Sequence, residues 1–213
     1  MGIDLKQLSV LLLDSSMTDQ QLKEDILFIR EFGIKAVIVL PCQITRTKQL
    51  LEGTTIQVGS IADYPLGAGT LGKQAFETGE IYRNGAAEVY ITATLENLPI
   101  SKQTFQMLEP LSFGKGQLGF FIDIDEMPEE DRSRIAFQIG RVNVKEILLG
   151  TGISVEDALF HLGIFRTARE RQLRVQVNVN SPTLLEIEIL LQSGADVIGI
   201  NNAREVLPLL KKK

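Results

Sequence analysis

Short apolar runs alternate with amphipathic stretches along the whole chain, and the pair of patterns occurs eight times. The apolar runs are rich in Val, Ile and Leu and nearly continuous, which is typical of parallel strands that are buried on both faces. They predict strands at residues 9–14, 36–40, 55–62, 88–94, 118–123, 146–149, 174–178 and 197–201. The amphipathic stretches have helical spacing; in residues 19–32 the apolar stripe comprises Leu22, Ile26, Ile29 and Phe32.

Strands that alternate with helices predict right-handed crossovers and a parallel sheet. Gly33, Gly85 and Gly194 each follow a helical stretch and are expected to end it. Eight equal units without a glycine-rich dinucleotide turn favour a closed (β/α)8 TIM barrel over an open doubly wound sheet. The length of 213 residues is near the lower limit for such a barrel, roughly 200 residues, so a single α/β domain over residues 1–213 is predicted.

Composition excludes several function classes. The formal net charge of −5 is unfavourable for a nucleic-acid surface, because phosphate binding needs clustered cations. No apolar run reaches the roughly 18 residues of a membrane span, and the first residues lack the pattern of a signal peptide. The single cysteine cannot form an internal disulfide, so a reducing, cytoplasmic setting is expected.

Few side chains are available for histidine- or cysteine-based chemistry. His161 is the one histidine, which excludes a multi-histidine metal site, and its place in the helix after the sixth strand indicates a packing residue. Cys42 follows the second strand without a plausible base and is interpreted as a small semi-buried residue. The glycine-rich residues 66–70 precede a helix and leave two interpretations open, an anion site on backbone N–H groups or a turn with a helix start.

Several segments resemble the deoxyribose-phosphate aldolase family. Residues 63–70 read DYPLGAGT, where the family has a Phe-Pro-Leu-Gly-Ala turn after its third strand. Residues 84–89 read NGAAEV and resemble the family's Gly-Ala-Asp-Glu-Val, and residues 193–199 read SGADVIG and resemble its eighth strand. Shorter similarities lie in residues 13–16, 39–41, 121–123 and 150–157. The resemblance implies a (β/α)8 barrel, descent from a class I aldolase and a homodimer.

Members of that family cleave 2-deoxyribose 5-phosphate through an imine on a lysine of the sixth strand. The resemblance places this lysine on Leu148, a second lysine of the seventh strand on Gln176, and the fourth-strand aspartate on Tyr90. Two acids correspond to retained positions, Asp14 on the first strand and Asp123 on the fifth. An apolar side chain cannot form an imine, so the resemblance predicts that Schiff-base aldol chemistry has been lost.

Neighbouring lysines are not expected to replace the missing amine. Lys145 lies three positions before Leu148, so it points to the opposite face of the strand and toward its amino-terminal end. Lys115 precedes the fifth strand and is also expected at that end. The family's phosphate turn corresponds here to Val179-Asn180, and its eighth-strand serines correspond to Asn201-Asn202.

Polar residues are concentrated at the predicted carboxyl ends of the strands, where barrels of this type carry their sites. The candidate ligand-binding residues are Asp14, Asp63, Thr92, Asp123, Thr151, Asn178, Asn180 and Asn201, with Thr94, Asp125 and Asn202 beside them. Such acids and amides suit a hydroxyl-rich, uncharged or cationic ligand better than a phosphate. The alternatives are helix caps with solvated loop groups, or oxygen ligands for Mg²⁺ or Mn²⁺.

Three functions therefore stay open. The first is a degenerate barrel, a pseudoenzyme that binds a small polar or sugar-like ligand or a protein partner. The second is an active lyase on a small phosphosugar or aldehyde, and the third is a divalent-metal-dependent enzyme at the acidic mouth. We favour the first because the catalytic positions and the phosphate turn differ together. No cofactor is expected.

Overall fold

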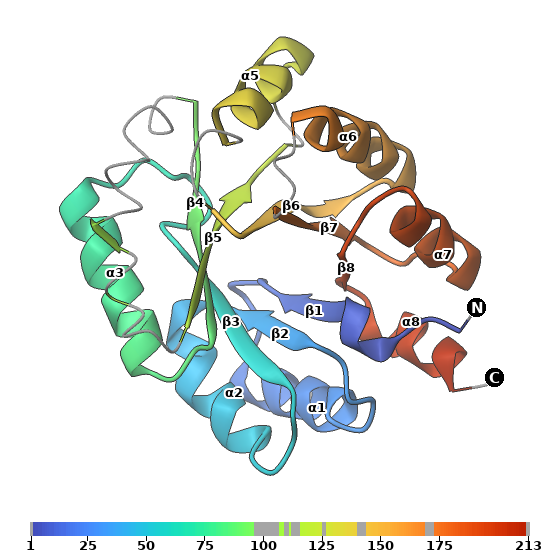
Figure 1. Ribbon diagram of the computed structural model, residues 1–213. Helices are drawn as coiled ribbons and strands as arrows, with labels where there is room; N and C mark the ends of the chain where they lie inside the picture. The colour runs from blue at the N-terminus through green and yellow to red at the C-terminus, as the bar shows by residue number, and fades with distance from the viewer. Residues whose placement is uncertain are drawn as a thin grey trace.

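A computed structural model describes residues 2–95, 107–108, 111, 116–124, 127–139, 144–168 and 173–211. Its eight strands pair in sequence order, all in parallel, and β1 also pairs with β8, so the sheet is a closed barrel (Figure 1). The strands are β1 Leu8–Leu12, β2 Ala36–Val39, β3 Gln57–Ala62, β4 Glu88–Thr92, β5 Gln117–Ile122, β6 Glu146–Ile153, β7 Arg174–Val179 and β8 Val197–Ile200. The predicted TIM barrel is confirmed, and the open sheet is excluded.

Helices cover the outside of the barrel (Figure 1). The α-helices are α1 Asp19–Ile29, α2 Ile44–Leu50, α3 Leu71–Arg83, α5 Glu129–Ile139, α6 Val155–Ala168, α7 Leu184–Gln192 and α8 Ala203–Leu210, and the 3-10 helices are η1 Leu5–Gln7 and η2 Pro41–Gln43. Threonine side chains start several of them: Thr18 and Thr183 form capping boxes with Gln21 and Glu186. Of the helices that fall within the described residues, none is long and apolar enough to cross a membrane.

Every strand end but one lies within two residues of its predicted position. The sixth strand was predicted to end at residue 149, yet β6 continues to Ile153. Gly150 and Gly152 have φ values of 68° and 147°, so the chain bulges there and resumes pairing with β7 at Ile153. A pattern of apolar residues cannot show this bulge, because the bulged residues are small or polar.

Helix α1 also ends earlier than predicted, at Ile29 instead of Phe32. The last residues form tight turns, in which the Phe32 N–H donates to the Ile29 carbonyl over 3.0 Å. Gly85 and Gly194 are confirmed as helix stops, since each directly follows the C-cap of its helix with a φ of 100° or 110°. Gly33, with a φ of 63°, ends the turns that follow α1 and not the helix itself.

The barrel interior and the layer under the helices form two separate apolar clusters. The interior cluster comprises Leu11, Ala36, Ile38, Ile61, Tyr90, Phe121 and Leu148, and the outer cluster contains the alternate strand residues packed on the helices. This division follows the period of two along each strand. The position that the family resemblance gives to the imine lysine is therefore part of the inner apolar core.

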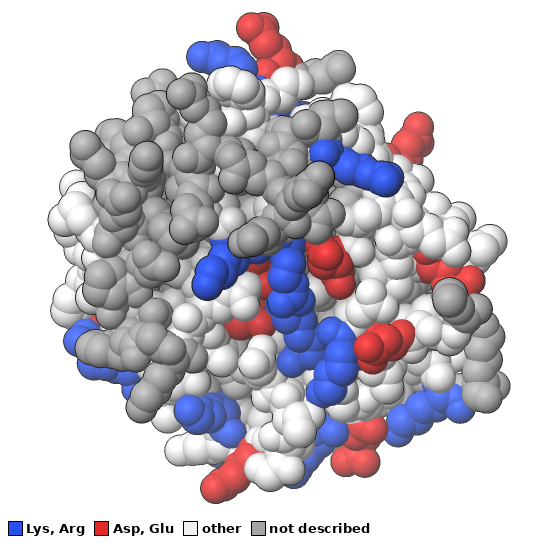
Figure 2. All heavy atoms as spheres, in the orientation of Figure 1, with Lys and Arg blue, Asp and Glu red and all other residues white. Residues whose placement is uncertain are grey.

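A buried ionic network closes the amino-terminal end of the barrel. The Lys35 Nζ lies 2.7 Å from Glu88 Oε1 and 3.1 Å from Glu146 Oε1. The Tyr90 hydroxyl donates to Glu88 Oε2 over 3.0 Å and to Glu146 Oε1 over 3.2 Å. Basic and acidic side chains also lie next to one another near the middle of the face shown in Figure 2. Both glutamates and the tyrosine are buried, so this network is part of the core.

Candidate functional site

A pocket of about 340 Å³ opens at the carboxyl ends of the strands, beside β1 and β8. It is lined by Leu11, Leu12, Leu13, Asp14, Met17, Asp25, Tyr64, Thr151 and Asn201. Asp14, Thr151 and Asn201 are among the ligand-binding residues that the sequence predicts. We call this hollow the mouth pocket.

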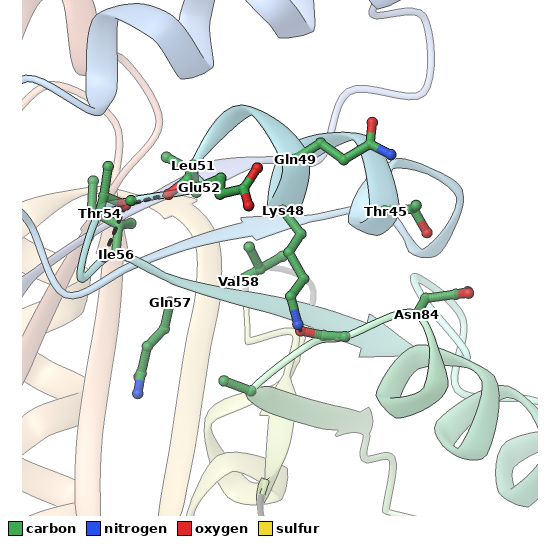
Figure 3. Close-up of a pocket in the computed structure, with 13 residues that line it drawn as sticks. Thr45, Lys48, Gln49, Leu51, Glu52, Thr54, Ile56, Gln57, Val58 and Asn84 are labelled. Atoms are coloured by element: carbon green, nitrogen blue, oxygen red, sulfur yellow. Dashed lines mark hydrogen bonds between the residues drawn. The ribbon is translucent and has the colours of Figure 1, made fainter.

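A second hollow, of about 520 Å³, lies between α2 and the turn that follows α3 (Figure 3). Its wall includes Gln57, the first residue of β3, so it lies toward the amino-terminal ends of the strands. The Lys48 ammonium, which lines it, donates to the Gly85 carbonyl over 3.2 Å. Barrels of this type carry their sites at the opposite end, and the mouth pocket is therefore the better candidate despite its smaller volume.

Asp63 holds the loop between β3 and α3. Its carboxylate accepts hydrogen bonds from the Gly69 N–H at 2.7 Å, the Gln74 amide at 3.0 Å and the Lys73 ammonium at 2.7 Å. Burial by itself would raise the pKa of Asp63, but these hydrogen bonds and the Lys73 charge outweigh it and hold the pKa below its usual value. The glycine-rich segment is thus a turn with a helix start, in which Thr70 caps α3.

Substitution Asp63→Asn is expected to destabilise the fold by about 1.5–3 kcal/mol. Asn tolerates the φ of 59° found at this position, so the backbone is retained while the charge and one acceptor are lost. The free energy of unfolding in urea measures the effect. Lys73→Met is the matched control: it removes an exposed partner and should cost less than about 1 kcal/mol, and an equal loss in both variants would contradict this account.

Tyr64 follows Asp63 and reaches over the barrel mouth. Its ring packs edge-on against Phe121, with the centroids 5.6 Å apart. Burial and the nearby charge of Asp123 raise the pKa of Tyr64, while a hydrogen bond with Thr151 lowers it. The sequence prediction did not include Tyr64 in the site, although a tyrosine here, where the family has phenylalanine, indicates a change at the mouth.

Amide side chains tie the ends of β6, β7 and β8 together. Asn180 Nδ2 donates to the Gly152 carbonyl over 2.9 Å, and Asn201 Nδ2 donates to Asn180 Oδ1 over 3.0 Å and also to the Thr151 carbonyl. A Cβ atom at Gly152 would lie 2.4 Å from Asn180 Oδ1, so glycine is needed for this close approach. These donors are engaged inside the protein, which makes them poor candidates for binding a phosphate.

The two family lysine positions are buried and uncharged. Leu148 is 0% exposed, and its register partner on β7 is Gln176, which is also 0% exposed. The Gln176 amide donates to Asn178 Oδ1 over 2.7 Å, and Asn178 donates to the Gly150 carbonyl over 2.7 Å. Asn178 is fully buried, as is Thr92, whose hydroxyl donates to the Ala62 carbonyl. These two predicted ligand-binding residues lie below the mouth surface.

Two described lysines near the predicted positions differ in place and charge from an imine-forming amine of the barrel interior. Lys145 is exposed and directly precedes β6, so it lies at the amino-terminal end of the barrel. Lys73 lies in the first turn of α3, but its hydrogen bond to Asp63 raises its pKa, the opposite of what an imine-forming amine needs. Lys115 and the predicted mouth residue Asp125 lie outside the described residues.

The structure also bears on the predictions for Cys42, His161 and a metal site. Cys42 was predicted to be semi-buried, which is wrong: it is exposed in η2, because the chain turns away from the sheet at Pro41. His161 is confirmed as a packing residue, 1% exposed on α6. For the metal alternative, the described part of the chain contains no group of three or more His, Cys, Asp or Glu side chains that could hold an ion.

His161 should make stability depend on pH. Burial and the charge of Arg132 lower its pKa to about 4. The unfolded chain takes up this proton near pH 6.5 and the folded chain does not, so stability falls as the pH drops from about 6.5 to about 4 and is unaffected above that window. We expect a loss of about 2 kcal/mol between pH 7 and pH 5.

Urea unfolding at both pH values measures this loss, and His161→Leu should remove most of the difference. Since the chain contains 1 histidine, no other imidazole contributes to it. An unchanged pH dependence in His161→Leu would show that the imidazole does not cause it.

Comparisons with known proteins agree with this barrel. No protein-family model matches the chain. The sequence is 23% identical over 184 residues to the deoxyribose-phosphate aldolase of Geobacillus sp. (strain WCH70), covering 84% of this chain and 82% of that protein. The structure of QR15, an aldolase, matches with a TM-score of 0.82 at 18% identity and covers 99% of this chain and 97% of its own. The tetrameric deoxyribose phosphate aldolase of Aeropyrum pernix matches with a TM-score of 0.79 at 14% identity, covering 97% and 91%.

The sequence match extends over most of both proteins, and the structural matches cover nearly the whole barrel. At these identities, the structural likeness supports the fold alone, whereas the sequence match supports common descent. The description of one relative as a tetramer shows that such barrels can be oligomeric. Deoxyribose-phosphate aldolases are therefore homologues of this chain, and their eight-stranded parallel barrel is its fold.

Proposed function

We propose that this protein is an aldolase-like barrel that has lost imine chemistry and binds a small polar ligand at its mouth. The observation that carries the proposal is the pair Leu148 and Gln176, both buried and neither able to form an imine. Aldol cleavage through an imine needs a nucleophilic amine and a second cation that keeps it partly neutral. The hydrocarbon of Leu148 supplies neither.

The mouth pocket supports ligand binding by a different set of groups. Asp14, Thr151 and Asn201 present oxygen and nitrogen atoms beside apolar walls, a combination that orients small ligands. The amide cluster at the ends of β6 to β8 donates hydrogen bonds to neighbouring carbonyls, which disfavours the binding of a phosphate there. Assembly into a homodimer and a cytoplasmic location remain predictions from the sequence.

The proposal is tested by aldol cleavage of 2-deoxyribose 5-phosphate. Purified protein is incubated with this sugar, and acetaldehyde release is followed beside the Geobacillus enzyme as a positive control. We expect no release above that of protein-free buffer. Saturable release that disappears when one lysine is replaced would overturn the proposal.

A further inference from the structure

Asp14 is an acid at the mouth pocket whose negative charge has no cationic partner in the part of the chain that the structure describes. Its Oδ1 accepts hydrogen bonds from the Ser16 N–H at 2.8 Å and the Ser16 hydroxyl at 2.7 Å. These two bonds hold the pKa of Asp14 below its usual value, so the carboxylate is ionised at neutral pH. Among the described residues, no Lys, Arg or His lies within ion-pair distance of it.

Two described cations on this side of the barrel, Arg204 and Lys73, are already paired with other acids. Arg204 Nε lies 2.7 Å from Asp25 Oδ1, and its guanidinium also stacks over the Phe28 ring. Lys73 pairs with Asp63 at 2.7 Å. Positions 148 and 176 are uncharged, so neither supplies an ammonium from below.

The surroundings of the mouth pocket add to its preference for a cation. An adjoining hollow of about 350 Å³ shares Asp14, Met17 and Asp25 with it. Glu24 and Arg204 also line this hollow, so its three acids outnumber its one cation, which pairs with Asp25. Asn201 Oδ1 is buried and has no hydrogen-bond partner among the described residues, while its Nδ2 donates to two acceptors. The polar side of the pocket thus presents the negative charge of Asp14.

The remaining wall is apolar, with Leu11, Leu13, Met17 and the Tyr64 ring. This wall suits a short hydrocarbon segment next to a charged group. The volume of about 340 Å³ is near the lower end of ligand sites, roughly 300–1,000 Å³, so the ligand is small.

We propose that the mouth pocket binds a small organic ammonium ion, with Asp14 pairing the nitrogen and Leu13, Met17 and Tyr64 contacting its hydrocarbon part. The inference rests on the proposed function, because it assumes that no lysine of the protein occupies the pocket. A protonated amine donates hydrogen bonds as well as charge, and it therefore matches the carboxylate of Asp14.

Three probes of similar size test the sign of the charge: ethanolamine, ethylene glycol and glycolate. Binding is measured by calorimetry and by thermal shift at low ionic strength, where exposed charges are least screened. We expect ethanolamine to bind more tightly than the neutral and anionic probes. Asp14→Asn should weaken the binding of ethanolamine at least about tenfold. The control Asp19→Asn removes an exposed acid that does not line the pocket, and it should leave binding unchanged.

Equal binding of all three probes, preference for glycolate, or no binding of ethanolamine would each overturn the ammonium proposal. So would an equal effect of Asp14→Asn and Asp19→Asn. Circular dichroism verifies that both variants are folded before binding is scored. Cleavage of 2-deoxyribose 5-phosphate is assayed without these probes, so failure of the ammonium proposal is distinguishable from failure of the proposed function.

Discussion

Lys35→Met is expected to destabilise the fold by about 3–5 kcal/mol. The substitution removes the ammonium that lies 2.7 Å from Glu88 and 3.1 Å from Glu146. Both glutamates are almost fully buried, at 2% and 0% exposed, so two negative charges would remain without their nearest cation. Arg174, 3.9 Å from Glu146 and half-exposed, compensates little. Urea unfolding at neutral pH gives the change in free energy.

Two further variants separate charge from packing at Lys35. Lys6→Met is the matched control, because the Lys6 ammonium donates to the Ile34 carbonyl and the Thr55 hydroxyl and pairs with no acid among the described residues. It should cost less than about 1 kcal/mol. Adding Glu88→Gln and Glu146→Gln to Lys35→Met removes the buried charge and should restore part of the stability. If the triple variant is less stable than Lys35→Met, uncompensated charge is not the cause.

Restoring both lysines, as Leu148→Lys with Gln176→Lys, is expected to leave aldol cleavage at least about 1,000-fold below that of the Geobacillus relative. An enzyme loses most of its rate when any member of a set of catalytic groups is missing. In this variant Tyr90 would still replace the family's aspartate, and the amide cluster would still replace its phosphate turn. The new ammonium groups would also be register partners in a fully buried layer, where each repels the other.

Acetaldehyde release and urea unfolding are measured together for this double variant. Leu148→Met with Gln176→Met is the matched control, since it keeps the volume without the charge. Cleavage near the rate of the relative would show that two lysines suffice and that the rest of the mouth is still adapted to the phosphosugar.

The fold follows closely from the apolar pattern, because each strand of a barrel must be apolar on both faces. The prediction failed where backbone conformation, not hydrophobicity, decides the structure. Gly150 and Gly152 extend β6 through positive φ values, and the tight turn at Phe32 shortens α1. Neither effect changes the number or order of the strands.

The sequence predicts where the candidate site lies but not which of its side chains are free to bind a ligand. The rule that strand ends carry the site places Asp14, Thr151 and Asn201 at one pocket. It does not show that the Asp63 carboxylate is hydrogen-bonded to Lys73 and Gln74, which lie in the first turn of α3. The position of Thr92 two residues below the predicted strand end explains why it is buried.

The ionic network at the amino-terminal end was not predicted at all. Lys35 and Glu146 are 111 positions apart in the chain and meet only because the barrel closes. In the sequence, each looks like an ordinary charged residue at the start of a strand. Contacts of this range depend on the register of several strand pairs, which periodicity alone does not give.

The central claim, that no lysine of this protein forms an imine, is tested most directly by trapping. The protein is incubated with acetaldehyde and borohydride, and its mass and tryptic peptides are analysed beside the Geobacillus enzyme. This reaction reports on every lysine, including those outside the described residues. We expect the control enzyme to be modified and this chain to stay unmodified, whereas a stoichiometric reduced adduct on a single lysine of this chain would show that it does form an imine.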